Sequence, residues 1–141
     1  MSLTPLQLVL ISSGLSLTGA LIGAAITYCY AVRLAKRNAR REAGRQVREA
    51  FRPEIAAMDP VAGEEGRDVE RLLREAWPKH HAAVSELMFH LPPHERAALE
   101  TAWRAYYEVG GSIRFFDYHF GDKPWEIFQE RVNDILKWTV V

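Results

Sequence analysis

The chain has 141 residues, of which 48% are hydrophobic and 26% are charged, so it has the length of one small domain and the composition of a folded protein. Its single cysteine, Cys29, excludes a disulfide framework and a four-cysteine zinc site. The formal net charge is zero, but the charges are unevenly placed. Residues 1–32 carry none, residues 33–52 carry eight basic and two acidic residues, and residues 53–141 carry ten basic and sixteen acidic residues.

The first segment has the composition of a transmembrane anchor, which we assign to residues 1–32. Its stretch 6–32 provides 27 uncharged residues, and a helix needs about 20 to cross a bilayer. A cleaved secretory signal is the alternative. Such signals carry positive charge before a shorter apolar stretch, whereas every basic residue here follows it. We therefore expect a retained, single-pass membrane helix.

The basic residues that follow the anchor predict its orientation. Five of them come directly after it and are expected to contact lipid headgroups: Arg33, Lys36, Arg37, Arg40 and Arg41. Short basic flanks stay on the cytoplasmic side of a membrane, so we expect the N-terminus outside and the rest of the chain in the cytoplasm. In a prokaryote this membrane would be the inner one.

Small residues within the anchor suggest helix–helix association. The sequence Gly19-Ala20-Leu21-Ile22-Gly23 matches the small-xxx-small pattern that lets two membrane helices approach closely. The residues expected at the seam are Ser16, Gly19, Ala20, Gly23 and Ala24. The seam would face a second copy of the chain or a different membrane protein. Because small residues are common in membrane helices, the pattern also fits a helix that associates with nothing.

Residues 33–56 are predicted to continue the membrane helix as a basic juxtamembrane stalk, disturbed at Pro53. Arginines recur at helical spacing along one face and alanines occupy another, which leaves little apolar area for lying flat on a bilayer. No aromatic stacking residues are interleaved with the arginines and no base-reading motif is present. We therefore expect membrane lipid, and no nucleic acid, as the partner of this segment.

The remainder is predicted to be a linker, 57–66, and a small helical domain, 67–141. A helical stripe of apolar residues starts at Val69 and reaches Pro78, where the helix either kinks or restarts. Further helices are expected from Pro93 to about Gly110 and from about Asp122 through Leu136. Residues 112–121 fit either a short extended segment or an aromatic loop. The fold class is thus all-α: one transmembrane helix, a basic helical stalk and a cytoplasmic bundle of three to four helices.

Aromatic residues are concentrated after residue 102, and two interpretations remain open for them. They fill the core of a small domain, because each ring buries a large area. Alternatively, four of them line a groove that receives a partner helix or peptide: Tyr107, Phe115, Tyr118 and Trp125. Core filling is the simpler interpretation, because most of these positions continue the helical stripes.

No convergent catalytic set is evident, and no cofactor is predicted. Glu86 and His90 have the i, i+4 spacing of metal ligands, and His94 follows the Pro-Pro corner, so these three are weak candidates for a metal site. The leading hypothesis is a membrane-tethered protein-interaction module that binds another protein or itself. The alternatives are a membrane-bound metal-dependent enzyme and an accessory subunit of a membrane complex.

The overall architecture resembles that of small bacterial single-pass proteins with a helical cytoplasmic domain. The excess of arginine over lysine, 14 against 4, is similar to that of bacteria with GC-rich genomes. The resemblance is one of architecture alone and assigns no functional residue.

Overall fold

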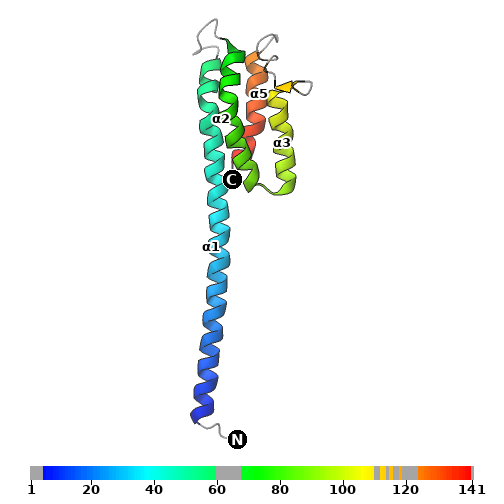
Figure 1. Ribbon diagram of the computed structural model, residues 1–141. Coiled ribbons are helices and arrows are strands. Elements are labelled where there is room, and N and C mark those ends of the chain that lie inside the picture. Colours follow the sequence, from blue (N-terminus) through cyan, green and yellow to red (C-terminus); the bar gives the residue numbers. More distant parts are fainter. Residues whose placement is uncertain are drawn as a thin grey trace. The chain divides into compact units, whose positions relative to one another are not determined.

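The computed structural model describes the backbone of residues 5–59, 68–109, 112–113, 115, 118 and 124–140 (Figure 1). Side chains are described for residues 19–59, 68–108, 115, 118 and 125–140. The elements in chain order are α1 (Pro5–Met58), α2 (Val69–His90), α3 (Pro93–Tyr107), β1 (Glu108–Val109), β2 (Ser112–Ile113), α5 (Pro124–Leu136) and the 3-10 turn η1 (Lys137–Thr139). The chain divides into unit 1, residues 1–37, and unit 2, residues 38–141.

The prediction of an all-α fold is confirmed for the described residues. The only extended elements among them are β1 and β2, which pair antiparallel with Glu108 opposite Ile113 and Val109 opposite Ser112. Residues 112–113 are therefore extended, whereas most of the ambiguous stretch 112–121 lies outside the described residues.

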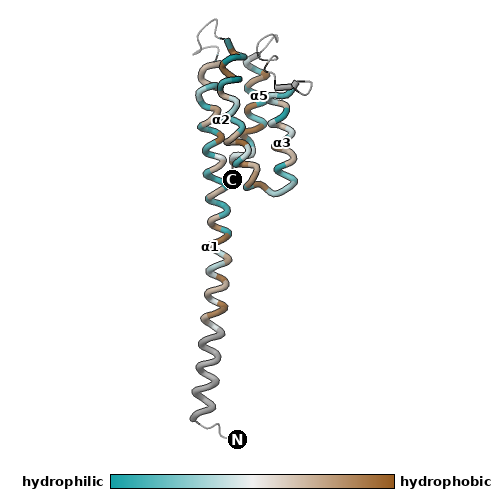
Figure 2. The backbone as a smooth tube through the Cα atoms, in the orientation of Figure 1, coloured by the Kyte–Doolittle hydropathy of each residue, from teal (hydrophilic) through white to brown (hydrophobic). Residues whose placement is uncertain are grey.

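Unit 1 is the first part of α1, and all of its described side chains except that of Val32 are exposed. Leu21, Ile22 and Ile26 are 56–71% exposed, and Tyr28 and Tyr30 are similarly open. Over the described residues, no helix combines the length and the apolar character that a membrane crossing requires. The side chains of residues 1–18, which make up more than half of the predicted anchor, lie outside the described part. Figure 2 shows hydrophobic segments of α1, in brown, directly after its grey part, and a mixture of hydrophobic and hydrophilic residues farther along the helix.

Unit 2 begins with the second part of α1, which belongs to the bundle. Ala43, Val47, Ala50 and Phe51 are 0–3% exposed and occupy positions i, i+4, i+7 and i+8, so they form one helix face. The segment that the sequence predicts to be a free basic stalk thus provides the first helix of the folded unit. Most of its arginines face solvent. Because the buried face has only two large side chains, Val47 and Phe51, the apolar pattern of this helix is difficult to recognise in the sequence.

α2 is one continuous helix that includes Pro78. The side chain of Asp68 caps it by accepting a hydrogen bond from the Arg71 amide at 3.0 Å. The helix neither ends nor restarts at Pro78, although proline removes one backbone hydrogen bond there. Burial of Leu73, Val84 and Leu87 on both sides of the proline keeps the helix in register with the core.

The corner between α2 and α3 is closed by an arginine. Arg96 Nε donates to the carbonyl of Met88 at 3.0 Å, and its Nη2 donates to that of Leu91 at 3.4 Å. The Met88 carbonyl also accepts from the Leu91 amide at 3.2 Å, so the arginine adds a second donor at the end of α2, where carbonyls lack the regular i+4 partner. α3 starts with Pro93 at its first position, as the sequence predicts, and Arg40 of α1 forms an ion pair with Glu95 at 2.5 Å. This pair holds the start of α3 against α1.

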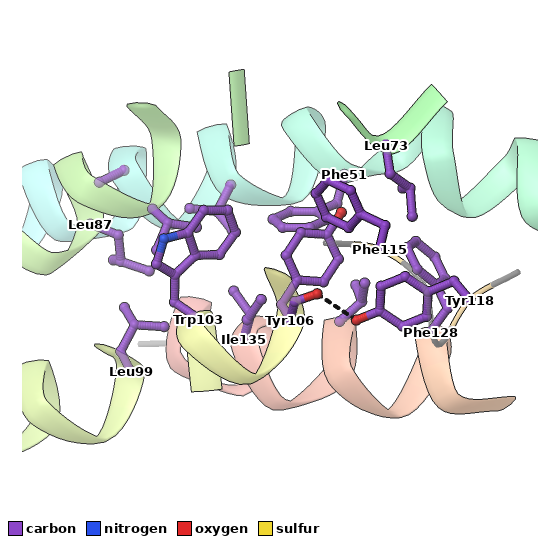
Figure 3. Close-up of a cluster of buried hydrophobic side chains, with 14 of the residues drawn as sticks. Phe51, Leu73, Leu87, Leu99, Trp103, Tyr106, Phe115, Tyr118, Phe128 and Ile135 are labelled. Atoms are coloured by element: carbon purple, nitrogen blue, oxygen red, sulfur yellow. Dashed lines mark hydrogen bonds between the residues drawn. The ribbon is translucent and has the colours of Figure 1, made fainter. Parts of the chain in front are cut away.

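The core of unit 2 is aromatic and centres on Tyr106 (Figure 3). The Tyr106 ring lies 5.9 Å, between centroids, from the His80 imidazole and 5.3–6.3 Å from the rings of five Phe, Tyr or Trp residues. These belong to Phe51, Trp103, Phe115, Tyr118 and Phe128. Leu73, Leu87, Leu99 and Ile135 complete the contacts between the helices. Each buried ring contributes apolar area and edge-to-face contacts worth about 0.5–1.5 kcal/mol per pair.

Gly44 allows α1 and η1 to touch. A Cβ atom placed on Gly44 would lie 2.8 Å from the carbonyl oxygen of Thr139, so the backbones are too close for any side chain. Next to this contact, Arg48 Nη1 donates to the carbonyl and the hydroxyl of Thr139, both at 2.8 Å. The glycine thus fixes where the C-terminal turn packs.

We predict that Gly44→Val lowers the free energy of unfolding of unit 2 by roughly 1–3 kcal/mol, because the side chain must displace η1. Gly19→Ala is the control, since nothing lies within 4 Å of a Cβ at Gly19. Urea denaturation followed by circular dichroism measures both variants. Equal stability of Gly44→Val and the parent chain would show that η1 does not need this close approach.

Candidate functional site

The most unusual side chain of unit 2 is His80, which is fully buried in the core. Its Nε2 atom lies 3.1 Å from the carbonyl oxygen of Ala50 and 3.1 Å from Oε2 of Glu54, both on α1. Its Nδ1 atom lies 3.2 Å from the hydroxyl of Tyr106 on α3. The imidazole on α2 therefore links three helices. We call Glu54, His80 and Tyr106 the buried polar network.

The partners of the ring determine where its proton lies. The carbonyl of Ala50 and a carboxylate only accept hydrogen bonds, so Nε2 carries the proton and donates to both. In the neutral ring Nδ1 is then the acceptor, and the Tyr106 hydroxyl donates to it. The Tyr118 hydroxyl donates to the backbone carbonyl of Tyr106 at 2.7 Å, drawn as a dashed line in Figure 3. All three polar groups of the network thus have partners.

Burial and hydrogen bonding act in opposite directions on Glu54. Burial raises the pKa of this carboxyl, but the hydrogen bond from His80, a backbone hydrogen bond and the electrostatic influence of the His80 and Lys79 side chains together hold the pKa below its usual value. Burial, followed by the charges of Tyr118 and Glu54, raises the pKa of Tyr106 well above its ordinary value. Glu54 is therefore the ionised acceptor and Tyr106 the protonated donor.

The geometry suits structural support better than catalysis. The Phe51 ring stacks on the imidazole with centroids 4.0 Å apart and planes at 13°. Glu54 is 8% exposed and Tyr106 is 1% exposed, so a substrate has no route to the ring. A carboxylate, an imidazole and a phenol in a row resemble a proton relay, yet here they hold α1, α2 and α3 in one register.

His80 was not among the candidate residues predicted from the sequence, which included only His90 and His94 of the five histidines. Its position in the sequence could have indicated burial, because His80 lies at helical spacing from the buried residues Leu73, Val84 and Leu87. Glu54 likewise continues the face of Val47 and Phe51. A polar residue on an apolar stripe implies a buried partner, but the sequence does not say which one.

The three weak metal candidates do not converge. Glu86 Oε1 and His90 Nε2 form a pair at 3.0 Å, whereas His94 is 82% exposed beyond the corner, with Nε2 4.0 Å from Glu95. In the part of the chain with described side chains, no three His, Cys, Asp or Glu residues are grouped to hold a metal ion.

The four residues of the proposed groove do not share one surface. Phe115 and Tyr118 are 1% and 3% exposed and belong to the core. Tyr107 and Trp125 are half-buried at its edge. Tyr107 packs against Trp77 and Trp103, at centroid distances of 5.9 and 5.1 Å.

The predicted lipid-contacting and association residues fall in different environments. Arg33, Lys36, Arg37 and Arg41 are exposed, whereas Arg40 is the partner of Glu95. Gly19, Ala20, Gly23 and Ala24 are exposed on unit 1. Ser16 lies outside the residues whose side chains are described.

We predict that His80→Ala destabilises unit 2 by about 3–5 kcal/mol, because Glu54 and Tyr106 are left buried without their partner. His94→Ala, at an exposed histidine, is the control and is expected to stay within about 0.5 kcal/mol of the parent chain. Chemical denaturation measures both. A loss below about 1 kcal/mol for His80→Ala would contradict the role given to the network.

Glu54 also predicts how stability depends on pH. Because the pKa of its carboxyl is lower in the folded state, the carboxylate stabilises the fold above its unfolded pKa. That stabilisation is lost as the pH falls below the ordinary value of 4.5 and through the folded value. Glu54→Gln should flatten the decline of Tm in this acidic range, and Glu75→Gln, on the exposed surface, should not. Parallel Tm curves for the parent chain and Glu54→Gln would exclude this contribution.

Comparison of the chain with protein-family models, with curated proteins and with solved structures gave no match. The residues themselves therefore provide the features for a proposal. These are the buried polar network of unit 2, the exposed apolar helix of unit 1 and the basic residues between positions 33 and 41.

Proposed function

We propose that the protein is a membrane-tethered helical interaction module: the first part of α1 is inserted in a bilayer and unit 2 is held at its surface. The observation that carries this proposal is the exposure of the apolar side chains of unit 1. Leu21, Ile22 and Ile26 are 56–71% exposed on a continuous helix. Exposing several large apolar side chains to water costs about 1.5–3 kcal/mol for each.

The arrangement of these side chains favours lipid over a one-sided protein contact. Large side chains at positions 21, 22, 26, 28, 30 and 34 are exposed. At about 100° per residue they cover roughly 240° of the helix circumference and form no single stripe, and exposed alanines at positions 20, 24 and 31 occupy the remaining sector. A helix that is apolar all round is typical of a membrane span, whereas a helix docked on one partner shows a single apolar face.

The residues that flank this region fit the same proposal. Tyr28 and Tyr30 precede the first charge, where tyrosines favour the membrane interface, and exposed Arg33, Lys36 and Arg37 follow. The proposed span takes in residues 6–18, which continue the uncharged sequence towards the N-terminus. The basic flank would orient the N-terminus outside and unit 2 in the cytoplasm.

Self-association is part of the proposal. Nothing lies within 4 Å of a Cβ at Gly19 or Gly23, so this small-residue face is free to meet another helix. The Thr27 hydroxyl donates to the Gly23 carbonyl at 2.9 Å, which satisfies it within the helix. The partner at this face would be a second copy or another membrane protein.

Unit 2 supports binding rather than catalysis as its task. In the described part of unit 2, the Phe51 ring stacks on the imidazole of the buried Glu54–His80–Tyr106 set, and Glu86, His90 and His94 do not converge. A stable, closed helical unit on a tether is suited to present a surface to another protein. An enzyme remains the weaker candidate.

The anchor is tested with Ile22→Lys combined with Ile26→Lys. Each lysine costs about 2.5–3.5 kcal/mol at the centre of a span, so the parent chain should stay in the membrane pellet after alkaline carbonate extraction and the double variant should be released. Ile22→Leu with Ile26→Leu is the matched control and should stay in the pellet. Release of the parent chain by the same wash would overturn the proposal. Circular dichroism checks that unit 2 stays folded in each variant.

A further inference from the structure

The exposed large hydrophobic side chains of unit 2 are confined to one end of it. Among its described residues only two are strongly exposed, Phe89 at 75% and Val140 at 77%. Phe89 is in the last turn of α2, next to the corner with α3, and Val140 follows η1. Figure 1 shows the α2–α3 corner and the C-terminus at the same end of this unit.

That end is also where the chain enters unit 2. Arg40 pairs with Glu95 just beyond the α2–α3 corner, so residues 38–41 lie beside the corner. Asn38, Arg41 and Val140 line one open cavity, which places Val140 beside the same residues. We call the surface formed by Phe89, Val140, Arg41 and His94 the entry-end surface.

The charges of this surface favour an anionic or neutral polar layer. Its neighbouring carboxylates are occupied: Glu42 is bonded to Arg45, Glu86 to His90 and Glu95 to Arg40. Arg41 is exposed and has no ion pair with any described residue, and His94 is 82% exposed. Two exposed apolar side chains beside Arg41, whose charge has no partner among the described residues, are the pattern of proteins that rest on a lipid headgroup layer.

The chain length allows this contact. Asn38 follows Arg33, the first charged residue after the proposed span, by five positions. Even a fully extended chain of that length spans no more than about 18 Å. Residues 38–41 are therefore held within reach of the headgroups wherever the anchor is inserted.

We infer that the entry-end surface docks on the lipid headgroup region of the membrane in which the anchor lies, with Phe89 and Val140 inserted at the interface. The inference rests on the proposed function, because it needs the tether. Docking would hold unit 2 against the bilayer and leave its opposite end, where α2 begins, to meet a partner in solution. Anionic lipid would strengthen the contact through Arg41.

The experiment uses the full chain in phosphatidylcholine vesicles, with and without phosphatidylglycerol. Replacing Cys29, the one native cysteine, by Cys29→Ser allows a single fluorophore to be attached through His94→Cys. The matched control is Glu75→Cys, on an exposed residue fourteen positions before Phe89 in α2 and hence about 21 Å from it along the helix. Nitroxide-labelled lipids quench any fluorophore that lies in the headgroup layer.

We expect lipid nitroxides to quench the label at position 94 and not the label at position 75. Adding Phe89→Ser and Val140→Ser should lower the ratio of docked to free unit by about tenfold or more, because the apolar area no longer leaves water. Both side chains are exposed, so the fold should persist, and circular dichroism confirms it. Quenching at position 94 that persists unchanged in this double variant would overturn the inference.

A label on native Cys29 separates failure of the docking from failure of the tether. If the label at Cys29 is quenched and the labels at positions 94 and 75 are quenched to the same extent, the membrane anchor is supported and the docking of unit 2 is overturned. Absence of quenching at both Cys29 and position 94 would overturn the tether and the docking together. A signal at position 94 that depends on protein concentration and not on the lipid nitroxide would identify a second copy as the occupant, and membrane docking would be wrong.

Discussion

The face of α1 that carries Val47 and Phe51 is the contact on which the rest of unit 2 depends. Phe51 stacks on the imidazole of His80 and meets the rings of Trp103 and Tyr106, so α1 is joined to α2 and α3 in one place. The hydrogen bonds of the buried polar network fix the relative position of the three helices, which this apolar contact alone does not. Hydrogen bonds have fixed partners, whereas apolar surfaces can slide by a helical turn. The network therefore defines a single register for the three helices.

One helix thus performs two physical tasks. In residues 38–58, α1 buries a narrow face in the core and exposes most of its arginines together with Glu42 and Glu49. In residues 19–34, the same helix exposes apolar side chains on all sides. Our proposal follows from this contrast. A helix with one buried face and charged residues elsewhere, as in residues 38–58, is stable in water, whereas a helix that exposes apolar side chains, as in residues 19–34, is stable in lipid. The change occurs at Arg33, where the charge-free sequence ends.

Much of the fold follows from the periodicity of the sequence, and the parts that do not have identifiable causes. The stripe through Leu73, Val84 and Leu87 predicts α2, and the Pro-Pro corner predicts the start of α3. The core role of residues 43–51 is hard to predict, since two alanines, one valine and one phenylalanine give a weak apolar signal among arginines. The buried polar network could not be predicted in full. Glu54 and Tyr106 each lie 26 positions from His80, and only the packing of three helices brings them together.

Amide hydrogen exchange along α1, with the full chain in lipid nanodiscs, tests the central claim most directly. We expect two protected blocks, residues 19–32 shielded by lipid and residues 43–54 shielded by the core of unit 2, with faster exchange at residues 33–37 between them. In detergent-free buffer without lipid, only the second block should keep its protection. Exchange in residues 19–32 at the same rate with and without lipid would contradict the account, because it would mean that this part of α1 does not enter the bilayer.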